Sequence, residues 1–196
     1  MLISCNKFDN TKFKILPSVQ KIDFNNAYSN LNHNSIFTYY SENNNLFPVT
    51  LDRSLNFVQG KDSDSTILFS IDGSLNIRDE GYVLNIKENQ IIINAKDNAG
   101  LFYAVNTLSQ LLQDSKDQNI NLPLVDIEDF PSLSYRSIHL DIKHHTEKKE
   151  YYFNLIDELA SIKINGIIIE FEDKLGYEKR PLVASEDSYT IDWWIE

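Results

Sequence analysis

Residues 137–170 contain two short apolar segments on either side of an amphipathic one, and this order constrains the fold more than any other part of the chain. Ile138, Leu140 and Ile142 alternate with polar residues, a pattern typical of a strand with one covered face. Residues 167–169 are all isoleucine, which is typical of a strand covered on both faces. The amphipathic segment between them predicts a helix, so the whole predicts a βαβ unit.

The predicted helix has its own start and stop signals. Thr146 can cap it, and Glu147 suits a first turn because the helix dipole favours an anion there. Asn165-Gly166 is a typical end. Its expected apolar face is Phe153, Ile156, Leu159 and Ala160.

The leading part of the chain alternates between strand and helix patterns. Strands are predicted around residues 20–24, 36–40, 67–71, 82–86 and 91–95, because apolar and polar residues alternate there. Helices are predicted over 48–59, after Pro48, and as far as Leu112 after the capping pair Asp97-Asn98. Residues 1–126 therefore predict an α+β domain, a mostly antiparallel sheet carrying two helices, and residues 127–196 a second, partial domain.

Several segments, in this order and spacing, resemble the family 20 glycoside hydrolases, the β-N-acetylhexosaminidases. In the second half they are IEDFPSLSYRS at 127–137, Leu140-Asp141, LASIKINGIIIE at 159–170, and Asp173. In the first half ILPSVQKIDF at 15–24 and the run from Gly81 to Leu112 are similar to the non-catalytic domain that precedes the family's catalytic barrel. The resemblance implies that residues 127–196 are the truncated start of a TIM (β/α)₈ barrel.

The implied activity is removal of terminal β-linked N-acetylhexosamine by substrate-assisted retaining hydrolysis. The family's catalytic acid is the Glu of an adjacent Asp-Glu pair at the end of the fourth barrel strand. The two Asp-Glu pairs of this chain, at 79–80 and 157–158, fall in a predicted turn and on the polar side of the predicted helix. We therefore expect no catalytic residue in the chain and an inactive fragment of a longer enzyme.

The resemblance assigns a few substrate-binding residues. Arg136 matches an arginine that grips sugar hydroxyl groups; the alternative is an arginine that pairs with an acidic loop and holds the start of the strand. Asp173 matches the first member of an Asp-Asp pair, with Lys174 in place of the second, and Glu170 stands where a histidine is usual. Glu170, Glu172 and Asp173 either line the substrate pocket or lie on the surface. Asp141 has a site role, or is an ion pair or cap for the following loop.

The run from Glu170 to Asp173, followed by Tyr177-Glu178, resembles the hexosaminidase D-like branch of the family. Trp193 and Trp194 could stack on a sugar, although helical spacing assigns at least one of them to the core. His144-His145 has no third ligand at useful spacing, so we expect no metal and no cofactor.

Composition excludes other partners. A net charge of -11 argues against nucleic acid as a partner, because nucleic-acid binding needs clustered Lys and Arg.

The chain has no apolar run of the roughly 18 residues that a membrane helix needs, and its first residues are not typical of a signal peptide. We expect the chain as given to be soluble, and cytoplasmic, or secreted if the true start lies upstream. Its one cysteine, Cys5, cannot form an intrachain disulfide.

Carbohydrate is the expected partner, and two alternatives stay open. Residues 1–126 could be a non-catalytic carbohydrate-binding or interaction module, or the leading part of another barrel exo-glycosidase. Two parallel strands also leave an unpaired edge. Residues 136–172 are therefore predicted to self-associate or to pack onto the edge of the first sheet.

Overall fold

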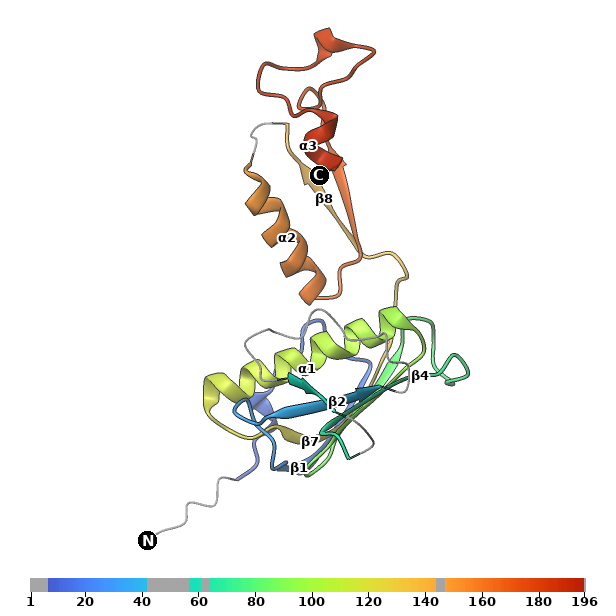
Figure 1. Ribbon diagram of the computed structural model, residues 1–196, viewed down its shortest axis with the longest axis vertical. Helices are drawn as coiled ribbons and strands as arrows, with labels where there is room; N and C mark the ends of the chain where they lie inside the picture. The colour runs from blue at the N-terminus through green and yellow to red at the C-terminus, as the bar shows by residue number, and fades with distance from the viewer. Residues whose placement is uncertain (1–6, 42–56, 61–63, 144–146, 196) are drawn as a thin grey trace. The chain divides into compact units, whose positions relative to one another are not determined.

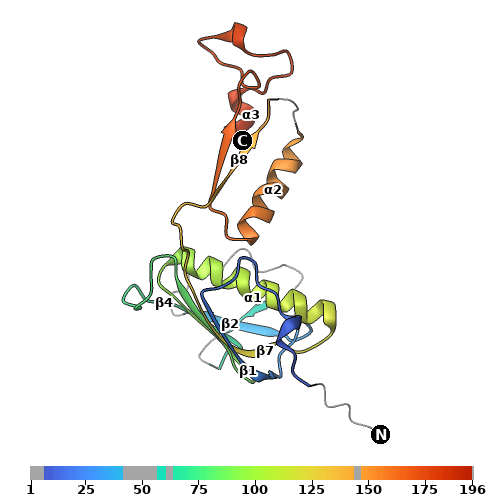
Figure 2. The same ribbon diagram turned by 180° about the vertical axis from the view of Figure 1, so that it is seen from behind.

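The computed structural model describes residues 7–41, 57–60, 64–143 and 147–195. The chain divides into two compact units, Met1–Ser132 and Leu133–Glu196 (Figures 1 and 2). The division therefore comes six residues after the predicted boundary at 126, because residues 127–129 belong to a strand of the first sheet. No helix of the described ranges is long and apolar enough to cross a membrane.

The first unit is built on a seven-stranded sheet with the order β1-β7-β5-β6-β4-β2-β3. Its strands are β1 Lys21–Tyr28, β2 Phe37–Ser41, β3 Phe57–Gln59, β4 Ile67–Ile71, β5 Tyr82–Ile86, β6 Ile91–Ala95 and β7 Pro123–Asp129. A 3-10 turn, η1, spans Asn10–Lys12 ahead of the sheet.

The sheet is mixed, so the prediction of a mostly antiparallel sheet is wrong for one half of it. The neighbours β1, β7, β5 and β6 pair antiparallel, whereas β6, β4, β2 and β3 pair parallel. Strand β6 pairs with β5 along one edge in an antiparallel hairpin. Along its other edge it pairs with β4, which runs parallel to it. Alternation along a strand indicates which face is covered and says nothing about the direction of the neighbouring strand.

One of the two predicted helices is present in the described residues. Helix α1 spans Asn98–Gln118, with Asp97 as its predicted cap. Most of the other predicted helix, over 48–59, lies outside the described residues, and its last part is strand β3, which pairs with β2. The prediction of a helix is therefore wrong for residues 57–59.

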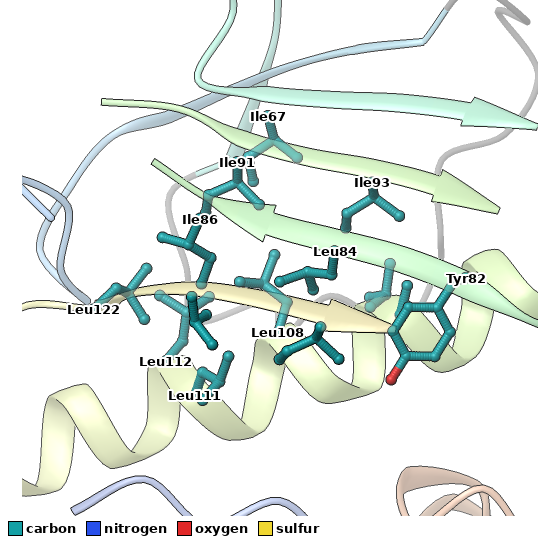
Figure 3. Close-up of a cluster of buried hydrophobic side chains, with 14 of the residues drawn as sticks. Ile67, Tyr82, Leu84, Ile86, Ile91, Ile93, Leu108, Leu111, Leu112 and Leu122 are labelled. Atoms are coloured by element: carbon teal, nitrogen blue, oxygen red, sulfur yellow. The ribbon is translucent and has the colours of Figure 1, made fainter. Parts of the chain in front are cut away.

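Helix α1 lies along one face of the sheet and closes a two-layer core (Figures 1 and 3). Alternate residues of β5 and β6 are buried, as the predicted period of two requires. They meet the buried leucines of α1, among them Leu108, Leu111 and Leu112. Each such side chain contributes roughly 1.5 to 3 kcal/mol through burial.

A polar network crosses this core. The hydroxyl of Tyr82 on β5 lies 2.6 Å from the Thr107 hydroxyl on α1 and donates to Oδ2 of Asp129 on β7 at 3.0 Å. The other oxygen of Asp129 accepts from the backbone N–H of Gln20 at 3.1 Å. The buried carboxylate of Asp129 on β7 therefore binds β5 and the segment before β1, and the Tyr82 hydroxyl extends this network to α1.

The second unit has the predicted strand, helix, strand order. Strand β8, Ser137–Asp141, pairs parallel with β9, Gly166–Glu170, and α2, Lys149–Ser161, connects them. The 3-10 turn η2, Pro181–Val183, and the short helix α3, Ile191–Ile195, follow β9.

Helix α2 differs from its prediction at both ends and in its buried face. Its first turn carries Glu150 in place of Glu147, and Thr146 lies outside the described residues. Phe153, an expected core residue, is 57% exposed, whereas Tyr152 is buried. At the other end the helix stops before Ile162, and Lys163 has a left-handed backbone with φ 65.

Candidate functional site

The carboxyl ends of β8 and β9 lie at the same edge of the second sheet. Asp141 is the register partner of Glu170, and the ladder continues with a bond from the Ile142 N–H to the Glu170 carbonyl at 3.2 Å. In parallel sheets this edge is where ligands usually bind. Glu170 and Asp173 therefore lie where a site is expected.

One face of the two strands is polar toward this edge. On β8 this face carries His139 and Asp141, which alternate with Ile138, Leu140 and Ile142. On β9 it carries their register partners, Ile168 and Glu170. Ile168 is 51% exposed on this face, whereas Ile142 on the opposite face is buried.

The ammonium of Lys143, at the end of β8, lies close to three carboxylates. Its Nζ lies 3.2 Å from Asp141 Oδ2, 3.4 Å from Glu172 Oε1 and 3.7 Å from Glu170 Oε1. The hydrogen bond that Lys143 donates to Asp141, and then the charges of Asp141, Glu172 and Glu170, raise the pKa of Lys143. Lys143 therefore stays a cation, and Asp141 has the ion-pair role that was one of its two predictions.

Asp141 also caps the following turn, because its Oδ1 accepts from the Lys143 N–H at 3.0 Å. Glu170 has a second basic neighbour, since its Oε2 lies 2.9 Å from His139 Nε2. We call Lys143, Asp141, Glu170, Glu172 and His139 the Lys143 cluster. Sequence reasoning missed Lys143 and His139, although His139 lies two residues before Asp141 and therefore on its face of the strand.

Asp173 begins a long loop that Lys174 holds together. Lys174 is 8% exposed, and its Nζ donates to Asp187 Oδ1 at 2.7 Å and to the Ser185 hydroxyl at 3.1 Å. The hydrogen bond with Asp187 raises the pKa of Lys174, and the same bond lowers the pKa of Asp187. The lysine that replaces the family's second aspartate is therefore the anchor of this loop.

Replacing Lys174 by methionine is expected to speed amide hydrogen exchange at Ser185 and Tyr189. Their N–H groups donate to the carbonyls of Asp173 and Lys174, and the lysine side chain fixes the facing strand of the loop. The matched control is Lys179→Met, which removes an exposed lysine of the same loop. Equal exchange in the two variants would show that the Lys174 ammonium does not organise the loop.

Arg136 lies at the opposite end of β8. Its Nε donates to the Lys163 carbonyl at 2.8 Å and its Nη1 to the Leu133 carbonyl at 2.6 Å. Its backbone exchanges bonds with Asn165, which the sequence had assigned to the end of the helix. These two bonds to backbone carbonyls favour the alternative in which Arg136 holds the start of the strand. Its assignment to the substrate stays a prediction.

The other candidates lie away from the strand ends. Asp79-Glu80 is in the turn before β5, and Asp157-Glu158 is on the exposed side of α2, as predicted. His144 and His145 are outside the described residues. Elsewhere in the described chain, no group of three or more His, Cys, Asp or Glu is placed to hold a metal ion.

The two tryptophans of α3 lie in an aromatic cluster. The Trp193 ring stacks on Tyr189 with centroids 4.0 Å apart, and the Lys149 ammonium lies 5.3 Å from the Trp193 centroid. Trp194 meets the rings of Phe171 and Tyr152 edge-on. Both tryptophans therefore pack on aromatic neighbours within the unit, but both are only half-buried, so the structure does not place either of them among the fully buried core residues.

Comparison with known proteins gives a consistent result. Residues 12–130 match the family model described as glycosyl hydrolase family 20, domain 2. The chain is 34% identical to a β-hexosaminidase of Vibrio vulnificus over 79 residues, which are 40% of this chain and 9% of that protein. It is 32% identical to a β-hexosaminidase of Porphyromonas gingivalis over 121 residues, 58% of this chain and 16% of that protein. The chain thus matches only a small part of each relative.

Solved structures share the fold. A β-N-acetylhexosaminidase from Bacteroides fragilis superposes with a TM-score of 0.72 at 21% identity, over 91% of this chain and 40% of that one. A Streptomyces plicatus N-acetyl-β-hexosaminidase in complex with Thio-NAglucal gives 0.65 at 24% identity, over 85% and 37%. A Vibrio harveyi exo-β-N-acetylglucosaminidase in complex with N-acetylglucosamine gives 0.67 at 20% identity, over 86% and 28%.

Proposed function

This chain belongs to glycosyl hydrolase family 20, whose domain 2 model matches more than half of it, and we propose that it is the leading part of an enzyme that removes terminal β-linked N-acetylhexosamine. The observation that carries this proposal is the match of residues 12–130 to a domain of that family. The names of the relatives, β-hexosaminidases of Vibrio vulnificus and Porphyromonas gingivalis, support the same chemistry.

The second unit is proposed to begin the catalytic (β/α)₈ barrel. Its parallel strands β8 and β9, joined through α2, are the first repeat that such a barrel requires. Support comes from the likeness to the Bacteroides fragilis enzyme, which extends over 91% of the chain and therefore includes part of this unit. The first unit is proposed to be the non-catalytic domain that precedes the barrel.

The proposed reaction is substrate-assisted. The acetamido oxygen of the sugar attacks C1 while a general acid protonates the leaving oxygen, and water then opens the cyclic intermediate, so that the configuration at C1 is retained. Glu170 and Asp173, at the carboxyl edge of the strands, are proposed to accept hydrogen bonds from the sugar. Their Glu-x-Glu-Asp run favours the hexosaminidase D-like branch.

Residues 1–196 alone are proposed to be inactive, because neither Asp-Glu pair lies at the carboxyl end of a strand. The test compares this chain with a longer chain that continues into the reading frame downstream of residue 196, using 4-nitrophenyl N-acetyl-β-D-glucosaminide. Turnover by the longer chain only is the expected result. Turnover by residues 1–196 would contradict the proposal.

A second candidate function is a carbohydrate-binding module formed by the first unit. It is favoured by the core that this unit has of its own, which extends from Phe13 to Ile127. Calorimetric titration of residues 1–196 with N-acetylglucosamine oligomers tests it. Binding that persists when Glu170 and Asp173 are replaced by alanine would place the saccharide on the first unit and favour this candidate.

A further inference from the structure

We propose that Lys143 and Glu170 together bind a hydroxyl group of the terminal sugar, and that His139 positions Glu170 for this contact. The inference rests on the proposed function. It assigns to Lys143 the cationic role that the sequence had assigned to Arg136. His139 acts through Glu170 and is a positioning residue.

The first step is the position of the two cations along β8. Arg136 precedes the strand, and Lys143 follows it. Lys143 contacts Asp141, the last residue of β8. Asp141 is five residues after Arg136 in an extended chain, so the backbones of these two residues are about 16 Å apart. The Arg136 guanidinium donates to two backbone carbonyls at its own end of the strand. Lys143 is therefore the cation that lies next to Glu170 at the other edge. Lys174, which follows Asp173, is held by Asp187 and Ser185.

The second step is the spacing within the Lys143 cluster. Asp141 and Glu172 lie within hydrogen-bond distance of the Lys143 ammonium, at 3.2 and 3.4 Å. Glu170 Oε1 is 3.7 Å away, which is too long for a hydrogen bond. A hydroxyl group suits this gap, because it accepts from the ammonium with its oxygen and donates to the carboxylate with its proton.

The third step is the orientation of Glu170. Its second oxygen, Oε2, is held at 2.9 Å by Nε2 of His139, which comes from the same face of the neighbouring strand. This contact aims Oε1 toward Lys143. A carboxylate has about four lone-pair sites, so Glu170 keeps acceptor capacity for a ligand after the His139 contact is made.

The test measures kcat and KM of the longer chain on 4-nitrophenyl N-acetyl-β-D-glucosaminide. Lys143→Met is expected to lower kcat/KM about 10- to 100-fold, mainly by raising KM, because a charged hydrogen bond to the sugar is lost in the ground state and transition state alike. Lys148→Met, which removes a nearby exposed lysine, is the matched control and is expected to change neither constant.

Substrates that lack the 3-, the 4- or the 6-hydroxyl group identify the contact. For the hydroxyl that Lys143 binds, the penalty of the deoxy substrate is expected to be smaller in Lys143→Met than in the unmodified protein, because both changes remove the same hydrogen bond. For His139, glutamine keeps an N–H near the position of Nε2 and is expected to preserve KM, whereas leucine is expected to raise it.

The outcomes separate this inference from the function on which it rests. An active longer chain in which Lys143→Met behaves like Lys148→Met would overturn the inference and leave the proposed function standing. An effect of Lys143→Met that is equal on the parent and on all three deoxy substrates would also overturn it, because it would show a structural role. A longer chain without any activity on the hexosaminide would contradict both the inference and the proposed function.

Discussion

Replacing Gly100 by alanine is expected to lower the free energy of unfolding of the first unit by about 2 to 3 kcal/mol. An added Cβ would lie 2.3 Å from the Gly81 carbonyl oxygen and 3.0 Å from its carbonyl carbon. The Gly81 backbone has little freedom to move, because its N–H donates to Arg78 and its carbonyl accepts from Lys96. Alanine is the better helix former by about 1 kcal/mol, and the clash with backbone outweighs this gain.

Hydrogen exchange at the amides of α1 measures this effect within the first unit. The matched control is Gly73→Ala, where an added Cβ meets nothing within 4 Å. We expect the control to leave exchange in α1 unchanged. Equal protection in the two variants would mean that α1 does not approach the turn before β5 as closely as described.

Replacing Tyr82 by phenylalanine is expected to lower the free energy of unfolding by about 1.5 to 3 kcal/mol at neutral pH. The change removes the hydroxyl that donates to Asp129 and contacts Thr107, and it leaves a buried carboxylate with one donor fewer. Tyr82 and Thr107 are both fully buried, so water cannot take the place of the hydroxyl.

The penalty of Tyr82→Phe is expected to shrink at alkaline pH. Burial, and then the charge of Asp129, raise the pKa of the Tyr82 phenol well above its ordinary value of 10.0. The unfolded phenol therefore loses its proton near pH 10 while the folded one keeps it. The stabilisation is full below pH 10 and falls by up to about 1.4 kcal/mol per pH unit above it.

Urea unfolding of the unmodified protein and of Tyr82→Phe between pH 8 and pH 11 measures this difference. Tyr40→Phe, at a half-buried tyrosine of β2, is the control and is expected to follow the unmodified protein. A penalty that stays constant across this range would contradict the assignment of a protonated phenol in the core.

The first unit was predictable where the local signals were complete. The alternation in Tyr82, Leu84 and Ile86 placed β5, and Asp97 placed the start of α1. The order and direction of the strands were not predictable, because they depend on pairings between distant segments such as β4 with β6. No strand was predicted over β7, because its second half carries the polar residues Asp126, Glu128 and Asp129, and the predicted boundary at 126 falls inside this strand.

The candidate site shows the same division. The motif match placed Glu170 and Asp173 near the carboxyl edge, because the two strands of a βαβ unit run parallel and their carboxyl ends meet at one edge of the sheet. Arg136 precedes the strand and lies away from that edge, so its assignment to the substrate rests on the motif match alone and stays a prediction. The contacts of Lys143 depend on turn geometry after Asp141, which no sequence pattern specifies.

The most direct test of the account is proton NMR of the sugar that the longer chain releases from 4-nitrophenyl N-acetyl-β-D-glucosaminide. The account predicts that N-acetylglucosamine is released first as the β anomer, because two successive inversions at C1 retain the configuration. Release of the α anomer first, or no release of sugar from the longer chain, would contradict it.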